Sequence, residues 1–134
     1  MTQNPVAPAV HAPTGAVLTI IRSESFAVLV LATATFFITG GNPWLFALCF
    51  FVPDVSFIAY TLGPKTGALA YNTVHSYLLP ALLGALGWLL AMPLLWQLAL
   101  ILAAHIGFDR TMGYGLKYAS AFGATHLGRV GRNT

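Results

Sequence analysis

The chain has 134 residues, which is enough for one domain. Hydrophobic residues make up 57% of it and charged residues only 7%, and the mean hydropathy is +0.78. A water-soluble domain carries about a quarter charged residues, so this composition argues against one. The net charge is +3. The basic residues stand at the ends of apolar runs rather than in one patch, which argues against nucleic-acid binding.

The apolar runs predict an all-α integral membrane protein, a four-helix bundle. Residues 1–15 contain three prolines and no charged side chain, and they predict a disordered N-terminal tail. Residues 16–118 form the expected transmembrane domain, and residues 119–134 a basic C-terminal tail. The four spans are expected at about residues 25–39, 44–62, 68–90 and 94–112.

The distribution of charge predicts how these spans are oriented. With four spans, both termini and the middle connection lie on one side of the membrane. The connections on the other side, residues 40–43 and 91–93, carry no charge. Basic residues favour the cytoplasmic side, so we expect both termini in the cytoplasm and a multi-pass protein of the bacterial inner membrane. The residues on that side are Arg22, Lys65, Arg110, Lys117, Arg129 and Arg132.

Four ionisable side chains interrupt the predicted spans at similar depths. Asp54 lies ten residues before Pro64, and His75 lies eleven after it, so each is about 15 Å from that turn. His105 and Asp109 are four residues apart on one helical face. Each such group alone at the bilayer centre costs at least about 2.5 kcal/mol, so we expect them to form one polar site.

Two imidazoles and two carboxylates can complete a zinc, manganese or iron site. We therefore predict that the four groups act as metal ligands or as catalytic acid–base groups, with metal-bound water as the nucleophile. Tyr71 and Asn72 are expected to orient a substrate. Arg110 and Lys117, at the cytoplasmic mouth, would bind an anionic head group or phosphate.

Three alternatives stay open. The polar residues could pair as a structural network that fixes helix register. They could conduct protons. A haem or chlorin could be held between His75 and His105 on adjacent spans, although no attachment motif accompanies them.

The blocks PDVSFIAY, LGPKTGALAYNTVHSYLLP, AHIGFDRTMGYGLKY and THLGRVGR resemble, in order and spacing, a family of small bacterial membrane proteins, domain of unknown function 4260. The resemblance covers about residues 22–132. It implies a compact four-span inner-membrane protein and brings no established activity.

The favoured hypothesis is a metal-dependent hydrolase that acts on a lipid or other amphiphile, and the alternative is a non-enzymatic membrane subunit. Whether the chain is an enzyme is left open by the sequence. The expected partners are the lipid bilayer and either a second copy of the chain or a larger membrane complex, with no nucleic acid.

Overall fold

The structure is a computed structural model, and it describes residues 12–130. Most of the predicted N-terminal tail, residues 1–11, and residues 131–134 lie outside the described residues. The described chain is mostly helical, as the sequence predicts. Its elements are α1 (Gly15–Ile38), α2 (Pro43–Phe50), the 3-10 helix η1 (Val52–Leu62), α3 (Pro64–Val74), α4 (Leu78–Leu89), α5 (Pro93–Met112), β1 (Ala124–Thr125) and β2 (Gly128–Arg129).

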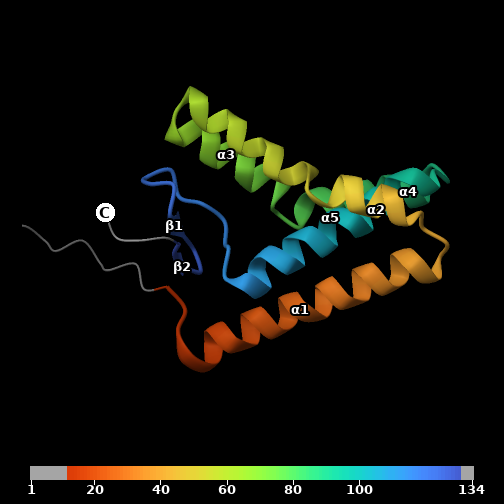
Figure 1. Cartoon of the computed structure of the whole chain (residues 1–134), viewed down its shortest axis with the longest axis horizontal. Coiled ribbons are helices and arrows are strands. Elements are labelled where there is room, and N and C mark those ends of the chain that lie inside the picture. The colour runs from red at the N-terminus through yellow and green to blue at the C-terminus, as the bar shows by residue number, and fades with distance from the viewer. Residues whose placement is uncertain (1–11, 131–134) are drawn as a thin grey trace, which may run out of the picture.

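Helices α1 and α5 run antiparallel along one side of the molecule (Figure 1). Their backbones approach closely at Gly107, where an added Cβ would lie 2.7 Å from the Ser25 carbonyl oxygen and 2.9 Å from the Leu29 nitrogen. Further toward the end of α5, Arg22 Nε donates to the Thr111 carbonyl at 2.7 Å. A residue without a side chain is needed for so close a contact, so Gly107 sets the spacing of this pair.

Helix α4 folds back onto α5 through a short turn, and Pro93 occupies the first position of α5, where its missing N–H costs nothing. Gly87 packs against the start of α5, since an added Cβ would lie 2.6 Å from the Trp96 nitrogen. Gly84, one turn earlier, has more room, with its nearest neighbour the Ala99 Cβ at 3.7 Å. Helices α4 and α5 therefore lie closer together near the turn that joins them than one turn further away.

The segment expected as one span at 44–62 consists of two helices. The Asn42 side chain caps α2 by accepting from the Trp44 N–H at 2.8 Å. The α-helix then ends at Phe51, and Pro53, which has no N–H, stands near the start of η1. A 3-10 helix of 11 residues is unusually long. It rises more per residue than an α-helix, so α2 and η1 together span about 34 Å.

The segment expected at 68–90 is also broken, at residues 75–77 between α3 and α4. The backbone N–H of His75 still bonds to the Tyr71 carbonyl at 2.9 Å, and His75 then ends the helix. The Ser76 hydroxyl accepts from the Leu78 N–H at 3.2 Å and starts the next helix. Pro80, in the first turn of α4, has no N–H to bond the Ser76 carbonyl, so an α-helix cannot continue unbroken through residues 75–77. Each broken segment carries one ligand of the predicted site at its break.

Helix α5 ends where the sequence predicts. Gly113 adopts the left-handed conformation with φ of 96°, and the Tyr114 N–H bonds back to the Asp109 carbonyl at 2.8 Å. The segment that follows is not a plain tail, because β1 and β2 form an antiparallel hairpin. Gly128, with φ of 117°, allows its tight turn.

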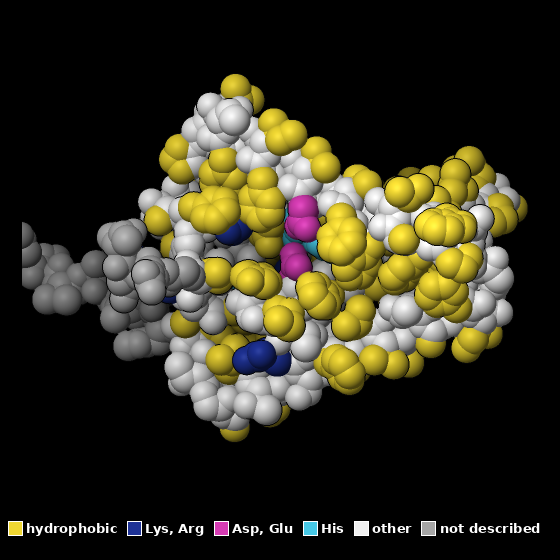
Figure 2. Space-filling model, viewed as in Figure 1, with side chains coloured by type: hydrophobic (Ala, Val, Ile, Leu, Met, Phe, Trp, Pro, Cys, Tyr) yellow, Lys and Arg dark blue, Asp and Glu magenta, His cyan; other side chains and the backbone are white. Residues whose placement is uncertain are grey.

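Two segments, Gly15–Ile38 and Pro43–Leu62, are long and apolar enough to cross a membrane by length and composition. Only 11% and 6% of their most apolar windows are buried within the protein. Large apolar side chains cover much of the visible surface of the described molecule (Figure 2). A soluble protein would bury such helices in its core, so this exposure is typical of contact with lipid.

Candidate metal centre

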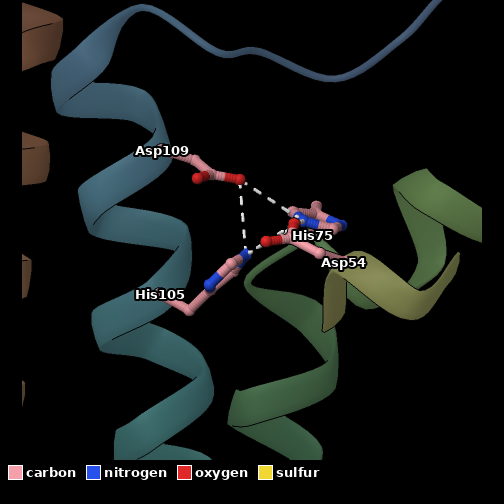
Figure 3. A group of neighbouring side chains, drawn as sticks. All are labelled: Asp54, His75, His105 and Asp109. Atoms are coloured by element: carbon pink, nitrogen blue, oxygen red, sulfur yellow. Dashed lines mark hydrogen bonds and ion pairs between the residues drawn. The ribbon is translucent and has the colours of Figure 1, made fainter. Parts of the chain in front are cut away.

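The four ionisable side chains singled out by the sequence converge on one point. His105 and Asp109 extend from α5, Asp54 from the first turn of η1, and His75 from the end of α3 (Figure 3). One potential ligand atom from each lies within 4.8 Å of all the others. The two helix breaks thus bring Asp54 and His75 to the face of the unbroken helix α5.

The distances between these atoms match a metal centre. His75 Nε2 lies 3.4 Å from Asp54 Oδ1 and 3.3 Å from Asp109 Oδ2. His105 Nε2 lies 3.4 Å from each of the same two oxygens, and 3.1 Å from His75 Nε2. Nitrogen and oxygen ligands bind zinc at about 2.0 to 2.1 Å, so tetrahedral ligand atoms lie about 3.3 to 3.4 Å apart. Four of the five distances have that value.

The hydrogen bond at His75 Nδ1 leaves Nε2 of that residue available to bind a cation. His75 Nδ1 lies 2.9 Å from the Tyr71 carbonyl oxygen, which only accepts, so Nδ1 carries a proton. A neutral His75 then directs the lone pair of Nε2 at His105 Nε2 and two carboxylate oxygens. Two imidazolium N–H groups could not face each other at 3.1 Å without repulsion. A metal ion that accepts one lone pair from each of the two nitrogens and two oxygens satisfies all four atoms.

The 3.1 Å separation of the two Nε2 atoms also bears on the haem or chlorin alternative. Axial nitrogens on opposite faces of a macrocycle, each about 2 Å from the metal, would lie about 4 Å apart. The rings of His75 and His105 are closer than this and meet edge to face, at 62°. Their geometry fits two neighbouring ligands of one small ion better than an axial pair.

The two histidines are buried, and the two carboxylates open the centre to a cavity. The side chains of His75 and His105 are 3% and 2% exposed, compared with 14% for Asp109 and 40% for Asp54. Both aspartates line a cavity of about 360 Å³. Figure 2 shows acidic side chains with histidine beneath them, in a recess surrounded by hydrophobic side chains. A small molecule can therefore reach the four potential ligand atoms from the carboxylate side.

Tyr71 and Arg110 both contact His75. The Tyr71 ring stacks on the His75 imidazole with centroids 3.8 Å apart and planes at 12°. Arg110 Nη2 donates to the His75 carbonyl at 2.9 Å, and its guanidinium lies over the Tyr77 ring. Metal-binding histidines are commonly fixed in this way by a second layer of hydrogen bonds.

Asn72 and Lys117 join α3 to the C-terminal segment. The Asn72 amide donates to the Lys117 carbonyl at 2.8 Å, and its oxygen accepts from the Lys117 N–H at 2.7 Å. This pair of bonds holds Lys117 beside the cavity, which it lines together with Tyr71. Of the four residues expected to contact substrate, Tyr71 and Lys117 line this cavity. Arg110 bonds to the backbone of His75, and Asn72 to that of Lys117.

Sequence reasoning did not single out the aromatic walls of the cavity. Phe57 comes from η1, Phe108 from α5, and Tyr114 and Phe122 from the segment after α5. In a chain with 13% aromatic residues, nothing in their spacing distinguishes them from lipid-facing side chains. Their proximity depends on the path of the C-terminal segment, which carries no periodic pattern.

Comparison with known proteins gives a family and no activity. No curated protein and no solved structure matched the chain. The profile of one family, described as Domain of unknown function (DUF4260), matches residues 18–130. This range includes all the described helices beyond the first three residues of α1, and all four residues of the candidate metal centre. The chain belongs to the DUF4260 family.

Proposed function

We propose that this protein is a multi-pass inner-membrane metalloenzyme, a zinc-dependent hydrolase of a lipid or other amphiphile. The observation that carries the proposal is that two imidazole nitrogens, 3.1 Å apart, each lie 3.3 to 3.4 Å from the same two carboxylate oxygens. Manganese and iron accept the same ligand types, but these distances favour tetrahedral zinc.

The membrane part of the proposal draws on α1 and the α2–η1 segment, which have the length and composition of spans and leave their apolar side chains exposed. We place two further spans at α3–α4 and α5, with both termini in the cytoplasm, because the basic residues then gather on one side. Broken helices at membrane depth occur where the irregular backbone is buried in protein or lines a cavity. The breaks at Phe51 and His75 border the metal centre and fit that pattern.

Hydrolysis is supported by the unequal exposure of the ligands. Asp54, at 40%, is the most exposed of the four, and it lines the cavity. We propose that Asp54 is a general base that would accept a proton from a water in the cavity as that water attacks an ester, amide or phosphodiester bond. Asp54 would then return the proton to the leaving alcohol or amine as the bond to it breaks. The metal would polarise the bond's oxygen as a Lewis acid. The aromatic walls suit the apolar part of an amphiphile.

A structural metal site is the second candidate. Four protein ligands complete a tetrahedral coordination, which is the usual state of structural zinc sites, whereas catalytic sites keep one position open. Under this candidate the metal joins η1, α3 and α5 and has no turnover. The two candidates share the metal and differ in the role of Asp54.

The first experiment is elemental analysis of detergent-purified protein, with wild type beside His75→Ala, His105→Ala and the control His126→Ala. His126 lies outside the centre, in the C-terminal segment, so its variant should keep the metal. We expect about one equivalent of zinc in wild type and its loss in both ligand variants. A metal-free wild type that also fails to bind added zinc or manganese would contradict both candidates.

The second experiment distinguishes the candidates by activity. Zinc-loaded protein is incubated with decyl esters, amides and phosphodiesters, before and after chelation. Hydrolysis that disappears on chelation, returns with zinc and is lost in Asp54→Ala while the metal is retained supports the enzyme. Metal binding without hydrolysis of any class, together with a melting temperature that falls on chelation, supports the structural site.

A further inference from the structure

The cavity beside the metal centre contains one basic side chain. Lys117 is 8% exposed and lines the cavity of about 360 Å³ together with Asp54 and Asp109. The three rings nearest its ammonium, those of Phe57, Tyr71 and Phe122, line the same cavity. Figure 2 shows a basic side chain recessed among hydrophobic ones beside the acidic recess. The charged end of Lys117 therefore belongs to the cavity.

Within residues 12–130, the hydrogen-bond and ring contacts of the Lys117 ammonium are with neutral groups. Its Nζ donates to the Phe122 carbonyl at 2.8 Å, and it lies 3.7 Å from the centroid of the Phe122 ring and 5.0 Å from that of Tyr71. Among residues 12–130 no carboxylate forms an ion pair with it. Burial lowers the pKa of Lys117, and the negative charge of Asp109 partly opposes this. An ammonium has three N–H donors, so two remain for a ligand.

With a divalent metal ion bound, the charged groups of the cavity have a net charge of +1. A divalent ion and the carboxylates of Asp54 and Asp109 sum to zero, and Lys117 adds +1. A buried charge without a counter-ion is unfavourable, so the cavity should bind a group with one negative charge. Building on the metalloenzyme proposed above, we propose that Lys117 is the anion-binding group of this cavity and that the substrate is an amphiphile with one anionic group, a carboxylate or phosphodiester.

The hydrogen bonds around Lys117 fix it in this role. Asn72 holds both backbone groups of Lys117, so the side chain enters the cavity from an anchored position. Arg110, the other cation near the centre, is already bonded to the His75 carbonyl and stacked on Tyr77. Arg110 therefore positions a ligand of the metal, and Lys117 is the cation available to a substrate.

Isothermal titration on zinc-loaded and on chelated protein in a non-ionic detergent tests the proposal. The probes share a decyl chain and differ in charge: decanoate and methyl decyl phosphate carry one negative charge, decanol none, and decyltrimethylammonium one positive charge. We expect both anions, or one of them, to bind at least about tenfold more tightly than decanol. Whichever anion binds more tightly identifies the class. Weaker binding of both anions than of decanol in wild type would overturn the proposal.

Variants assign the effect to Lys117. In Lys117→Gln the preference for anions should fall about ten- to hundredfold while the zinc content stays the same. Lys117→Arg keeps the charge and should keep the preference, and Lys65→Gln removes an exposed lysine on α3 and should change nothing. An unchanged preference in a folded Lys117→Gln protein would overturn the proposal. Should that variant not fold, the comparison of anions with decanol in wild type still decides.

The two proposals can fail separately. If wild type binds no metal but prefers the anions, and Lys117→Gln abolishes that preference, the anion site stands and the metalloenzyme fails. If zinc binds and a decyl ester or amide is hydrolysed, but the anions gain nothing from Lys117, the metalloenzyme stands and the anion site is overturned.

Discussion

Two parts of this molecule differ in whether their helices are continuous. The α1–α5 pair consists of unbroken helices in close backbone contact at Gly107. The α2–η1 and α3–α4 segments are interrupted, and their breaks carry Asp54 and His75. Helix α5 belongs to the continuous pair and also contacts α2 and α4 of the broken segments. The continuous pair therefore supplies a face with His105 and Asp109, and the broken segments bring the other two groups to it. Regular packing provides stability here, and irregular backbone provides the site.

The largest expected effect is the loss of stability caused by Gly107→Ala in the continuous α1–α5 pair. The added Cβ would lie 2.7 Å and 2.9 Å from backbone atoms of Ser25 and Leu29, which cannot rotate away. The two helices must separate, so we expect the free energy of unfolding to fall by up to about 3 kcal/mol. Chemical denaturation in detergent micelles, followed by circular dichroism, measures this. Unchanged stability would show that the α1–α5 contact is looser than described.

Arg110→Gln tests whether the break between α3 and α4 positions His75 for metal binding. Its guanidinium bonds the carbonyl that is left free where α3 ends at His75, so its loss should misplace that ligand and weaken zinc binding about ten- to hundredfold. Competition with a chromophoric chelator gives the affinity. The matched control is Arg22→Gln, since Arg22 also donates to a carbonyl, that of Thr111, but on the α1–α5 side. That control should lower stability by about 1 kcal/mol and leave zinc affinity unchanged.

The sequence predicted the continuous part and the membership of the site better than the broken part. Apolar runs and the glycine at 113 predict helices and the end of α5. The cost of ionisable groups in an apolar setting indicates that Asp54, His75, His105 and Asp109 meet. The break at His75–Tyr77 could have been predicted from Pro80, which cannot bond to the Ser76 carbonyl. The bond from Arg110 to the His75 carbonyl, which the sequence does not reveal, then stabilises the break. The C-terminal hairpin was missed because its place depends on tertiary bonds: the Lys117 N–H donates to Asn72, 45 residues away, and the Leu116 N–H donates to His126.

The C-terminal segment that closes the cavity should loosen in mild acid. The Leu116 N–H donates to His126 Nδ1 at 2.8 Å, so that nitrogen must be unprotonated. Burial, reinforced by the charge of Arg110, lowers the pKa of His126 in the folded protein. The unfolded chain then binds the proton at a higher pH than the folded chain, so this contribution is present above about pH 6.5 and lost as pH falls below it.

The expected loss is at most about 1 kcal/mol, the value of one hydrogen bond. Hydrogen exchange of the Leu116 amide between pH 7 and pH 5.5, corrected for intrinsic exchange, measures it directly. His126→Gln has no imidazole to titrate, and its corrected protection should not change over the same range. Equal pH dependence in the two proteins would contradict the assignment to His126.

The smallest effect, and the only stabilising one, is expected from Gly84→Ala. Gly84 lies within α4, and its nearest neighbour for an added Cβ is the Ala99 Cβ at 3.7 Å, an ordinary contact. Alanine is better than glycine within a helix by about 0.5 to 1 kcal/mol, so the free energy of unfolding should rise by that amount. The same denaturation assay compares Gly84→Ala with Gly107→Ala, which is also a glycine-to-alanine substitution but should lower the free energy of unfolding. A loss of stability in Gly84→Ala would mean that α4 and α5 pack as closely there as α1 and α5 do at Gly107, and that the two helix pairs do not differ.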